Sequence, residues 1–190
     1  MSIPISRHNK NKRFLINEFI FFSVNAGFQT RNEDFPIYDI ENRNLHDVRF
    51  LKRDIYEFLW NEFVNNQSNR MYDEKEHIKK IVQLKKTLES KYSKVLFQEK
   101  FRVGVSQKVI NLFFKYLWSA GLMNEPVHCP IDNIVKQRVE NIFKNAELQY
   151  WTEFDDLESY KKYIFYLKKI AESENKSIAK WEMNFWNRRT

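Results

Sequence analysis

Apolar residues recur every three or four positions along most of this chain, which is the spacing of one face of an α-helix. The first such stretch covers 11–26, and Gly27 is expected to end it. The second covers about Leu45–Asn65. The third covers about 73–88, with Asp73 as its N-cap and an acidic residue three positions later. The N-terminal half is therefore predicted to contain three helices, with an ordered loop between the first two.

The C-terminal half shows the same pattern. A short helix is expected over 92–99, and a longer one over 106–121, with Ser106 as its N-cap. The longer helix is apolar on most sides, so it is predicted to be central and buried. Two further helices are expected over 152–171 and after Ser177, and another begins near Pro130.

The composition agrees with a helical protein. The 190 residues include only three Gly and four Pro, too few for the many turns of an all-β protein. The hydrophobic content of 43% argues against disorder. We predict an all-α fold over residues 1–190, either one compact domain or two apposed helical lobes. Seventeen Phe, nine Tyr and five Trp exceed what such a core needs, so some rings should line a pocket or a contact surface.

Charge and cysteine content narrow the possible partners and sites. A formal net charge of +7 favours a polyanionic partner, although charge alone does not decide the matter. Cys129 is the only cysteine, which excludes intramolecular disulfides and disfavours a cysteine-based zinc site. The apolar run Phe14–Val24 is interrupted by Asn17 and Glu18, so it is predicted to be a helix rather than a signal peptide or membrane span. A cytoplasmic protein is the expectation.

Two side chains carry the prediction of function. Lys108 lies near the expected start of the central helix, and Asp132 lies at the expected start of the next one. They are 24 positions apart (132 minus 108), so an amine and a carboxylate could face one cleft from opposite sides. Taken alone, Lys108 would more often be a solvated lysine of the first helical turn, where the macrodipole disfavours an ammonium, and Asp132 a carboxylate that the macrodipole favours. The pair is more informative than either member.

The segment around these residues resembles the helix-hairpin-helix DNA glycosylases, the superfamily of endonuclease III and the 8-oxoguanine glycosylases. The expected hairpin and catalytic segment covers 92–144. The matching residues are Gly104, Val105, Lys108 and Asn111, followed by Pro130, Ile131, Asp132 and Val135. The likeness covers about forty of the 190 residues. It departs from the family in having Ser106 at the second hairpin glycine, a longer lysine-to-aspartate spacing and no four-cysteine cluster.

This resemblance implies a monomeric enzyme without a cofactor that flips a damaged or modified base out of double-stranded DNA. Asp132 would stabilise the cation-like sugar or deprotonate the attacking group. Lys108 could instead attack C1′ and form a Schiff base, which would permit strand cleavage. The resemblance does not separate a role in DNA repair from antiviral defence against phage with modified DNA.

Further residues are assigned around this pair. The expected DNA contacts are Gly104, Val105, Ser106, Gln107, Lys115, His128, Lys136 and Arg138. Candidate residues of the base pocket or wedge are Phe28, Phe35, Tyr38, Trp181 and Trp186.

Two other functions remain open at this stage. The chain could be a non-catalytic helical module that binds nucleic acid through the same hairpin, or a protein-interaction subunit with an acidic partner. Metal or cysteine chemistry at His128 and Cys129 is disfavoured, because the other histidines lack ligand spacing. The glycosylase hypothesis requires that Lys108 and Asp132 line one concave, basic groove.

Overall fold

The computed structural model describes residues 10–30, 32–42, 44–65 and 73–186, and these residues form helices joined by loops. The only β-type pairing among them is an isolated bridge between Tyr38 and Leu96. The all-α prediction is therefore confirmed. The helices are α1 (Lys10–Phe28), α2 (Leu45–Leu59), α3 (Glu74–Tyr92), α4 (Val103–Ser119), α5 (Asn133–Ile142), α6 (Leu157–Ser173) and α7 (Ile178–Met183). A π-helical segment, Trp60–Asn65, extends α2, and two 3₁₀ turns, Ser93–Val95 and Phe97–Glu99, follow α3.

Several helix ends lie where the sequence predicts them. The side chain of Asp73 caps α3 by accepting a hydrogen bond from the Glu76 amide at 2.7 Å. Ser177 caps α7 in the same way. Gly121 follows the end of α4 with φ +68°, a conformation that glycine adopts without strain, and the Leu122 amide returns to the Leu117 carbonyl at 2.8 Å.

Three predicted helix ends are wrong. Gly27 lies inside α1, where a Cβ atom would come within 2.4 Å of Val109 Cγ2, so glycine permits close contact between α1 and α4. Ser106 does not cap α4, because the helix already begins at Val103 and buries the Ser106 side chain. Thr152 does not cap α6; Asp156 does, accepting a hydrogen bond from the Ser159 amide.

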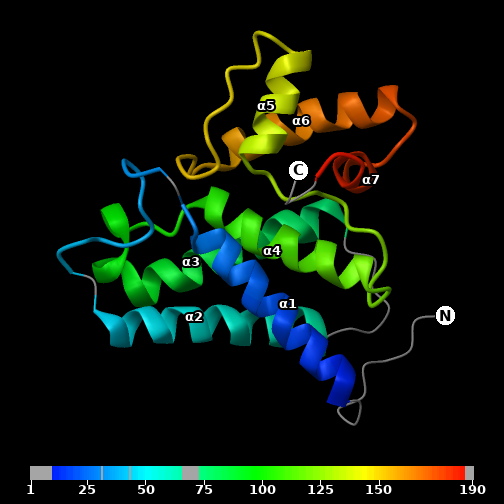
Figure 1. The fold of residues 1–190 in the computed structure, drawn as a ribbon. Coiled ribbons are helices and arrows are strands. Elements are labelled where there is room, and N and C mark those ends of the chain that lie inside the picture. Colours follow the sequence, from blue (N-terminus) through cyan, green and yellow to red (C-terminus); the bar gives the residue numbers. More distant parts are fainter. Residues whose placement is uncertain (1–9, 31, 43, 66–72, 187–190) are drawn as a thin grey trace.

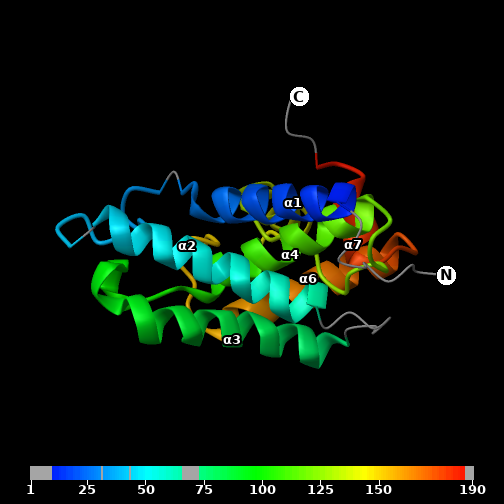
Figure 2. The ribbon, with the colours of Figure 1, turned by 90° about the horizontal axis from the view of Figure 1, so that it is seen from below.

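Helix α4 forms the centre of the molecule, as its apolar composition predicts. Figure 1 shows α1 and α2 on one side of α4 and α5, α6 and α7 on the other, while α3 passes behind α4. Figure 2 shows α1, α2 and α3 lying side by side. Helix α4 contacts α1, α3 and α6 directly. One cluster of buried apolar side chains extends from Ile16 in α1 to Trp181 in α7, through both groups of helices.

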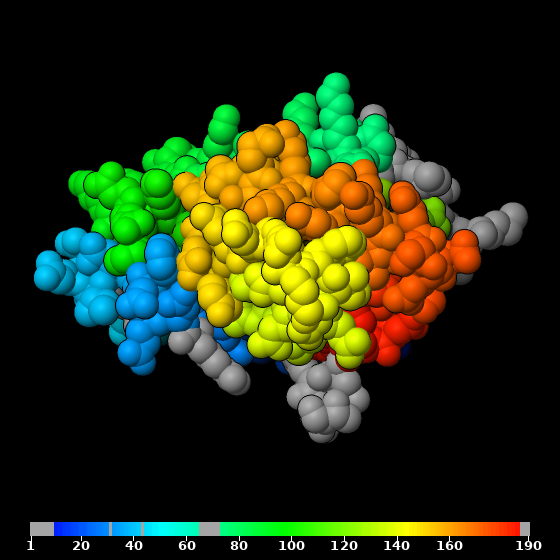
Figure 3. Space-filling view, turned by 90° about the horizontal axis from the view of Figure 1, so that it is seen from above, coloured from blue at the N-terminus to red at the C-terminus, as the bar shows by residue number. Residues whose placement is uncertain are grey.

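The second group of helices covers the upper face of the molecule. In Figure 3, residues of α5, α6 and α7 form most of the visible surface, in yellow, orange and red. The connection Phe143–Asp156 reaches back toward α4, where the Gly104 amide donates to the Phe154 carbonyl at 3.1 Å. Among the described helices, none has both the length and the apolar character needed to cross a bilayer.

Candidate active site

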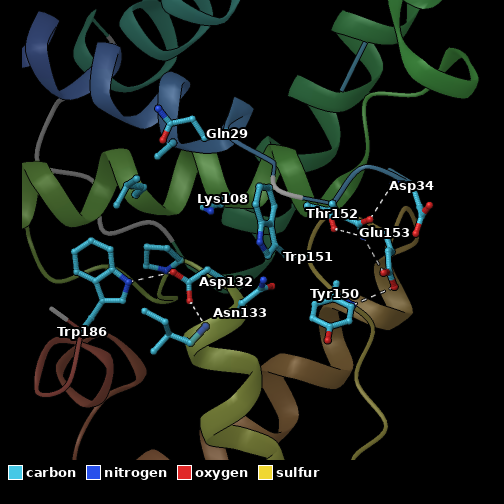
Figure 4. Close-up of a pocket in the computed structure, with 15 residues that line it drawn as sticks. Gln29, Asp34, Lys108, Asp132, Asn133, Tyr150, Trp151, Thr152, Glu153 and Trp186 are labelled. Carbon is cyan, nitrogen blue, oxygen red and sulfur yellow. Dashed lines mark hydrogen bonds between the residues drawn. The ribbon is translucent and has the colours of Figure 1, made fainter. Parts of the chain in front are cut away.

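Lys108 and Asp132 line the same pocket. The pocket has a volume of about 670 Å³, within the range of small-molecule sites. Its walls come from the C-terminal end of α1, from α4, from the start of α5, from the loop before α6 and from the chain after α7. In Figure 4, Trp186 and Asp132 lie at one end, Asp34 and Glu153 lie at the other, and Lys108 and Trp151 lie between them.

The expectation of a basic groove is wrong. The described lining residues include three carboxylates, Asp34, Asp132 and Glu153, against the single ammonium of Lys108. A phosphate would therefore be repelled from the interior of the pocket. The lining suits a neutral or hydrogen-bonding group better than an anion.

Lys108 is half-buried and lies on the second turn of α4, five residues after Val103. Its Nζ atom lies 3.7 Å from the centroid of the Trp151 ring, a cation–π distance. The sequence placed Lys108 in the first helical turn, where the macrodipole would disfavour an ammonium. The dipole effect is confined to that turn, and the Trp151 ring that faces Lys108 favours a cation.

Asp132 is held by three hydrogen bonds. It is the N-cap of α5, and Oδ1 accepts from the Ile134 and Val135 amides at 3.0 and 3.1 Å. Oδ2 accepts from Trp186 Nε1 at 3.1 Å. A carboxylate oxygen has two lone pairs. The two helix amides occupy both lone pairs of Oδ1, whereas Trp186 occupies one of Oδ2 and leaves the other for a ligand.

Gln107 fixes the chain next to Asp132. Its Nε2 donates to the Ile131 carbonyl at 2.8 Å, and its Oε1 accepts from the Ile131 amide at 3.1 Å. This pair of bonds connects α4, which carries Lys108, to the peptide that precedes Asp132. Gln107 is fully buried, so its predicted contact with DNA is wrong and it acts as a positioning residue.

Gly104, Val105 and Ser106 are also buried in the first turn of α4. The amide of Gly104 is already satisfied by the Phe154 carbonyl, and a Cβ atom on Gly104 would meet the Trp151 carbonyl oxygen at 1.8 Å. No short hairpin precedes the helix, because residues 93–102 pass through two 3₁₀ turns. The predicted phosphate contact by these three residues is therefore wrong.

Two of the remaining four predicted DNA contacts are internal. Lys115 is 6% exposed, and its Nζ donates to both carboxylate oxygens of Glu182 at 2.7 Å. His128 is 1% exposed and bonds through Nδ1 to the Tyr160 hydroxyl at 2.8 Å. Neither side chain can reach DNA in this arrangement, so both predictions are wrong.

The last two predicted DNA contacts lie on the surface of α5. Lys136 forms an ion pair with Glu140 at 2.7 Å and lies 4.5 Å from the Tyr150 ring centroid. Arg138 is exposed and lies 4.2 Å from the ring of Phe185. Arg138 remains accessible to a ligand, whereas the Lys136 side chain is only 11% exposed, and neither residue lines the pocket.

The ion pair of Glu182 and Lys115 contacts Trp186, which in turn donates a hydrogen bond to Asp132. Lys115 Nζ lies 4.2 Å from the centroid of the Trp186 ring, and that ring donates to Asp132. Burial raises the pKa of Glu182, and the Lys115 ammonium opposes that rise. The buried ion pair therefore anchors the C-terminal indole against the carboxylate.

Behind α4 lies a second polar network that the sequence did not indicate. His77 Nε2 contacts Asn111 Oδ1 at 2.6 Å, and Asn111 Nδ2 donates to the Cys129 carbonyl at 2.9 Å. Burial lowers the pKa of both His77 and His128 to about 3, so the two imidazoles are neutral at pH 7. Burial raises the pKa of the Cys129 thiol, which disfavours a thiolate nucleophile.

The predicted aromatic residues fall into three places. Trp186 lines the pocket with Lys108 and Asp132. Phe28 and Tyr38 line a second pocket beside it. Phe35 packs against Phe97, and Trp181 is buried against Phe185, so the prediction that these two belong to a base pocket is wrong.

Sequence reasoning missed the aromatic residues closest to Lys108. Tyr150 and Trp151 lie between α5 and α6, outside any helical stripe. Adjacent aromatics outside a periodic segment have no helix face to bury, which is the signal that could have identified them. Asn32 was also missed. Its Nδ2 donates to Thr152 and Glu153 at 3.3 and 3.2 Å and closes the end of the pocket opposite Asp132.

Within the described part of the chain, no group of three or more His, Cys, Asp or Glu side chains is arranged to hold a metal ion. Comparison of the chain with protein-family models, curated proteins and solved structures gives no match.

Proposed function

We propose that this pocket is the active site of a DNA glycosylase, in which an everted base enters beside Trp151 and its sugar lies between Lys108 and Asp132. The observation that carries the proposal is the meeting of this amine and this carboxylate in one pocket, in the order that the glycosylase resemblance implies. The half-buried Trp186 supplies an aromatic surface of the kind on which a flipped base stacks.

Asp132 would act on the sugar. Cleavage of the glycosidic bond leaves positive charge on C1′ and the ring oxygen, and a carboxylate nearby stabilises that charge. The three hydrogen bonds to Asp132 hold it in one orientation before the substrate binds. The remaining lone pair of Oδ2 could accept a proton from an attacking water or amine.

Lys108 would supply the nucleophile of a bifunctional enzyme. The neutral amine would bond to C1′ while the base departs with the electrons of the glycosidic bond, and the proton lost from nitrogen would pass to a base or to water. In the ligand-free protein the Trp151 ring faces Lys108 at 3.7 Å. The Trp151 ring is 4% exposed, so a base would reach it only by displacing the Lys108 ammonium.

The described lining of the pocket is not the basic groove that the glycosylase hypothesis required; its charge disfavours a phosphate and favours an uncharged base as the occupant. Three carboxylates surround a space of about 670 Å³, which excludes a phosphate but accepts the amino and imino donors of a nucleobase. Glu153 and Asn32 lie at the end opposite Asp132 and could read the edge of that base.

The test is a screen of base release from duplexes that contain normal, oxidised, alkylated and hypermodified bases. Asp132→Asn is a sharp variant, because asparagine is an equally good N-cap and should leave α5 intact. Its matched control is Asp156→Asn, which changes the N-cap of α6 outside the pocket and should retain activity. Base release that falls only in the Asp132 variant supports the proposal.

Borohydride trapping tests the lysine separately. Wild-type protein should form a covalent complex with a cleavable duplex, and Lys108→Gln should not. Absence of trapping with base release intact would leave Asp132 as the catalytic residue of a monofunctional enzyme. No base release from any duplex, in wild type and variants alike, would overturn the proposal.

A protein-interaction subunit is the second candidate function. It is favoured by exposed apolar side chains on one helix, α1, where Phe14 is 61% and Phe21 is 59% exposed. Paired changes of these residues to Ser should alter binding to a partner without affecting the pocket. The third function, nucleic-acid binding through a hairpin, loses its basis because that segment is buried.

A further inference from the structure

We infer that the second pocket, lined by Phe28, Tyr38 and Lys52, binds the nucleotide next to the everted one. This inference rests on the proposed function, since it extends the same site along a DNA strand. The second pocket has a volume of about 480 Å³ and lies at the junction of α1, α2 and the loop between them. Gln29 lines both pockets, so their contents would be neighbours.

The two pockets differ in charge. The pocket of Lys108 has three carboxylates and one ammonium among its described lining residues, whereas Lys52 is the single charged residue among those of the second pocket. A base without its phosphate suits the first, and a phosphate-bearing nucleotide suits the second. A strand that enters both would place a base in the acidic pocket and a phosphate at Lys52.

Lys52 is suited to this contact. Other lysines near the first pocket are neutralised, as Lys115 is by Glu182 and Lys136 is by Glu140. Lys52 makes no ion pair within the described parts of the chain, and its Nζ lies 5.5 Å from the centroid of the Phe28 ring. An ammonium without a carboxylate partner, next to an aromatic ring, combines the two features used to bind single-stranded nucleic acid.

The aromatic residues of the second pocket provide the stacking surface. Phe28 packs against Tyr38 with ring centroids 5.7 Å apart and against Phe101 at 5.9 Å. This packing holds the Phe28 ring rigidly, which lowers the entropy lost when a base stacks on it. Ile40, 84% exposed, lies at the rim, where it can contact the same base.

The test compares the affinity of the intact protein for thymidine 5′-monophosphate with its affinity for the thymidine dinucleotide and trinucleotide, by calorimetry. We expect the dinucleotide to bind roughly tenfold more tightly than the monophosphate, the size of one added stacking contact, and the trinucleotide to add little to that gain. Lys52→Gln should remove most of that gain. The matched control is Lys144→Gln, an exposed lysine that lines neither pocket.

The outcomes separate this inference from the proposed function. If the protein releases bases but a second nucleotide adds no affinity, the inference is overturned and the glycosylase proposal stands. Equal affinities of the Lys52 and Lys144 variants for the dinucleotide would have the same meaning. Loss of the gain only in Lys52→Gln supports it. The same loss in a protein that releases no base would support the second pocket as a nucleotide site while overturning the glycosylase.

Discussion

Trp186 Nε1 donates a hydrogen bond to Asp132 Oδ2 at 3.1 Å, which joins two residues that are 54 positions apart in the sequence. The same carboxylate receives its other two bonds from the helix that it caps. Trp186 is therefore the one contact to Asp132 that can be removed without disturbing α5. It orients the oxygen that faces the pocket.

Trp186→Phe should lower the turnover of base release about tenfold, because a hydrogen bond to a charged group contributes about 1.5 kcal/mol. Phenylalanine keeps an aromatic ring beside Lys115, so KM should change little and the free energy of unfolding should fall by no more than about 1.5 kcal/mol. Steady-state kinetics and urea unfolding measure the two effects. Trp118→Phe, outside the pocket, is the control, and equal losses in both variants would contradict a positioning role for Trp186.

The sequence predicts most of the helices because their signals are local. Periodic apolar spacing located α1, α2 and α3, and side-chain caps at Asp73 and Ser177 marked two starts. The start of α4 was placed three residues late. The segment Trp151–Phe154 buries its first turn, and a contact across some fifty residues leaves no local pattern.

The same distinction applies to the site. The order of Lys108 and Asp132 along the chain was enough to suggest that they share a pocket. The burial of Lys115 and His128 was not predictable, because their hydrogen-bond partners lie 67 and 32 positions away in the sequence. A lysine or histidine is normally a surface residue, and only the folded structure shows which carboxylate or hydroxyl permits its burial.

Glu182→Gln should lower the free energy of unfolding by about 3 kcal/mol, because it leaves the buried Lys115 ammonium without a counter-charge. The double variant Lys115→Met, Glu182→Leu should recover most of that loss, since it removes both charges. Urea unfolding measures each value. Glu158→Gln, which breaks the exposed pair with Lys161, should cost under about 0.5 kcal/mol. A loss in Glu182→Gln as small as this control would show that the pair is not effectively buried.

Acidification should destabilise the protein below about pH 6.5. The unfolded chain binds protons at His77 and His128 near pH 6.5, whereas the folded protein binds them only near pH 3. The unfolded state therefore holds more protons between these values, and the free energy of unfolding falls by about 1.4 kcal/mol per pH unit for each histidine. The stability that the neutral imidazoles provide is fully present above pH 7.

The measurement is urea unfolding at a series of pH values. His128→Gln should reduce the slope of stability against pH between about 6 and 4. His46→Gln, which changes an exposed side chain, should leave the slope as in wild type. A slope that is the same in all three proteins would contradict burial of the two neutral histidines.

Gly104→Ala distinguishes a packing role from a DNA-binding role for the first turn of α4. The new Cβ atom would lie 1.8 Å from the Trp151 carbonyl oxygen, so α4 and the Trp151–Phe154 segment must separate. We expect a loss of about 3 kcal/mol in the free energy of unfolding, at the upper end of overpacking effects. Gly121→Ala, where a Cβ atom meets nothing within 4 Å but φ is +68°, should cost only about 1 kcal/mol through backbone strain. If Gly104 instead approached a phosphate, its variant would unfold like wild type and bind duplex DNA more weakly, which thermal unfolding and fluorescence anisotropy would reveal together.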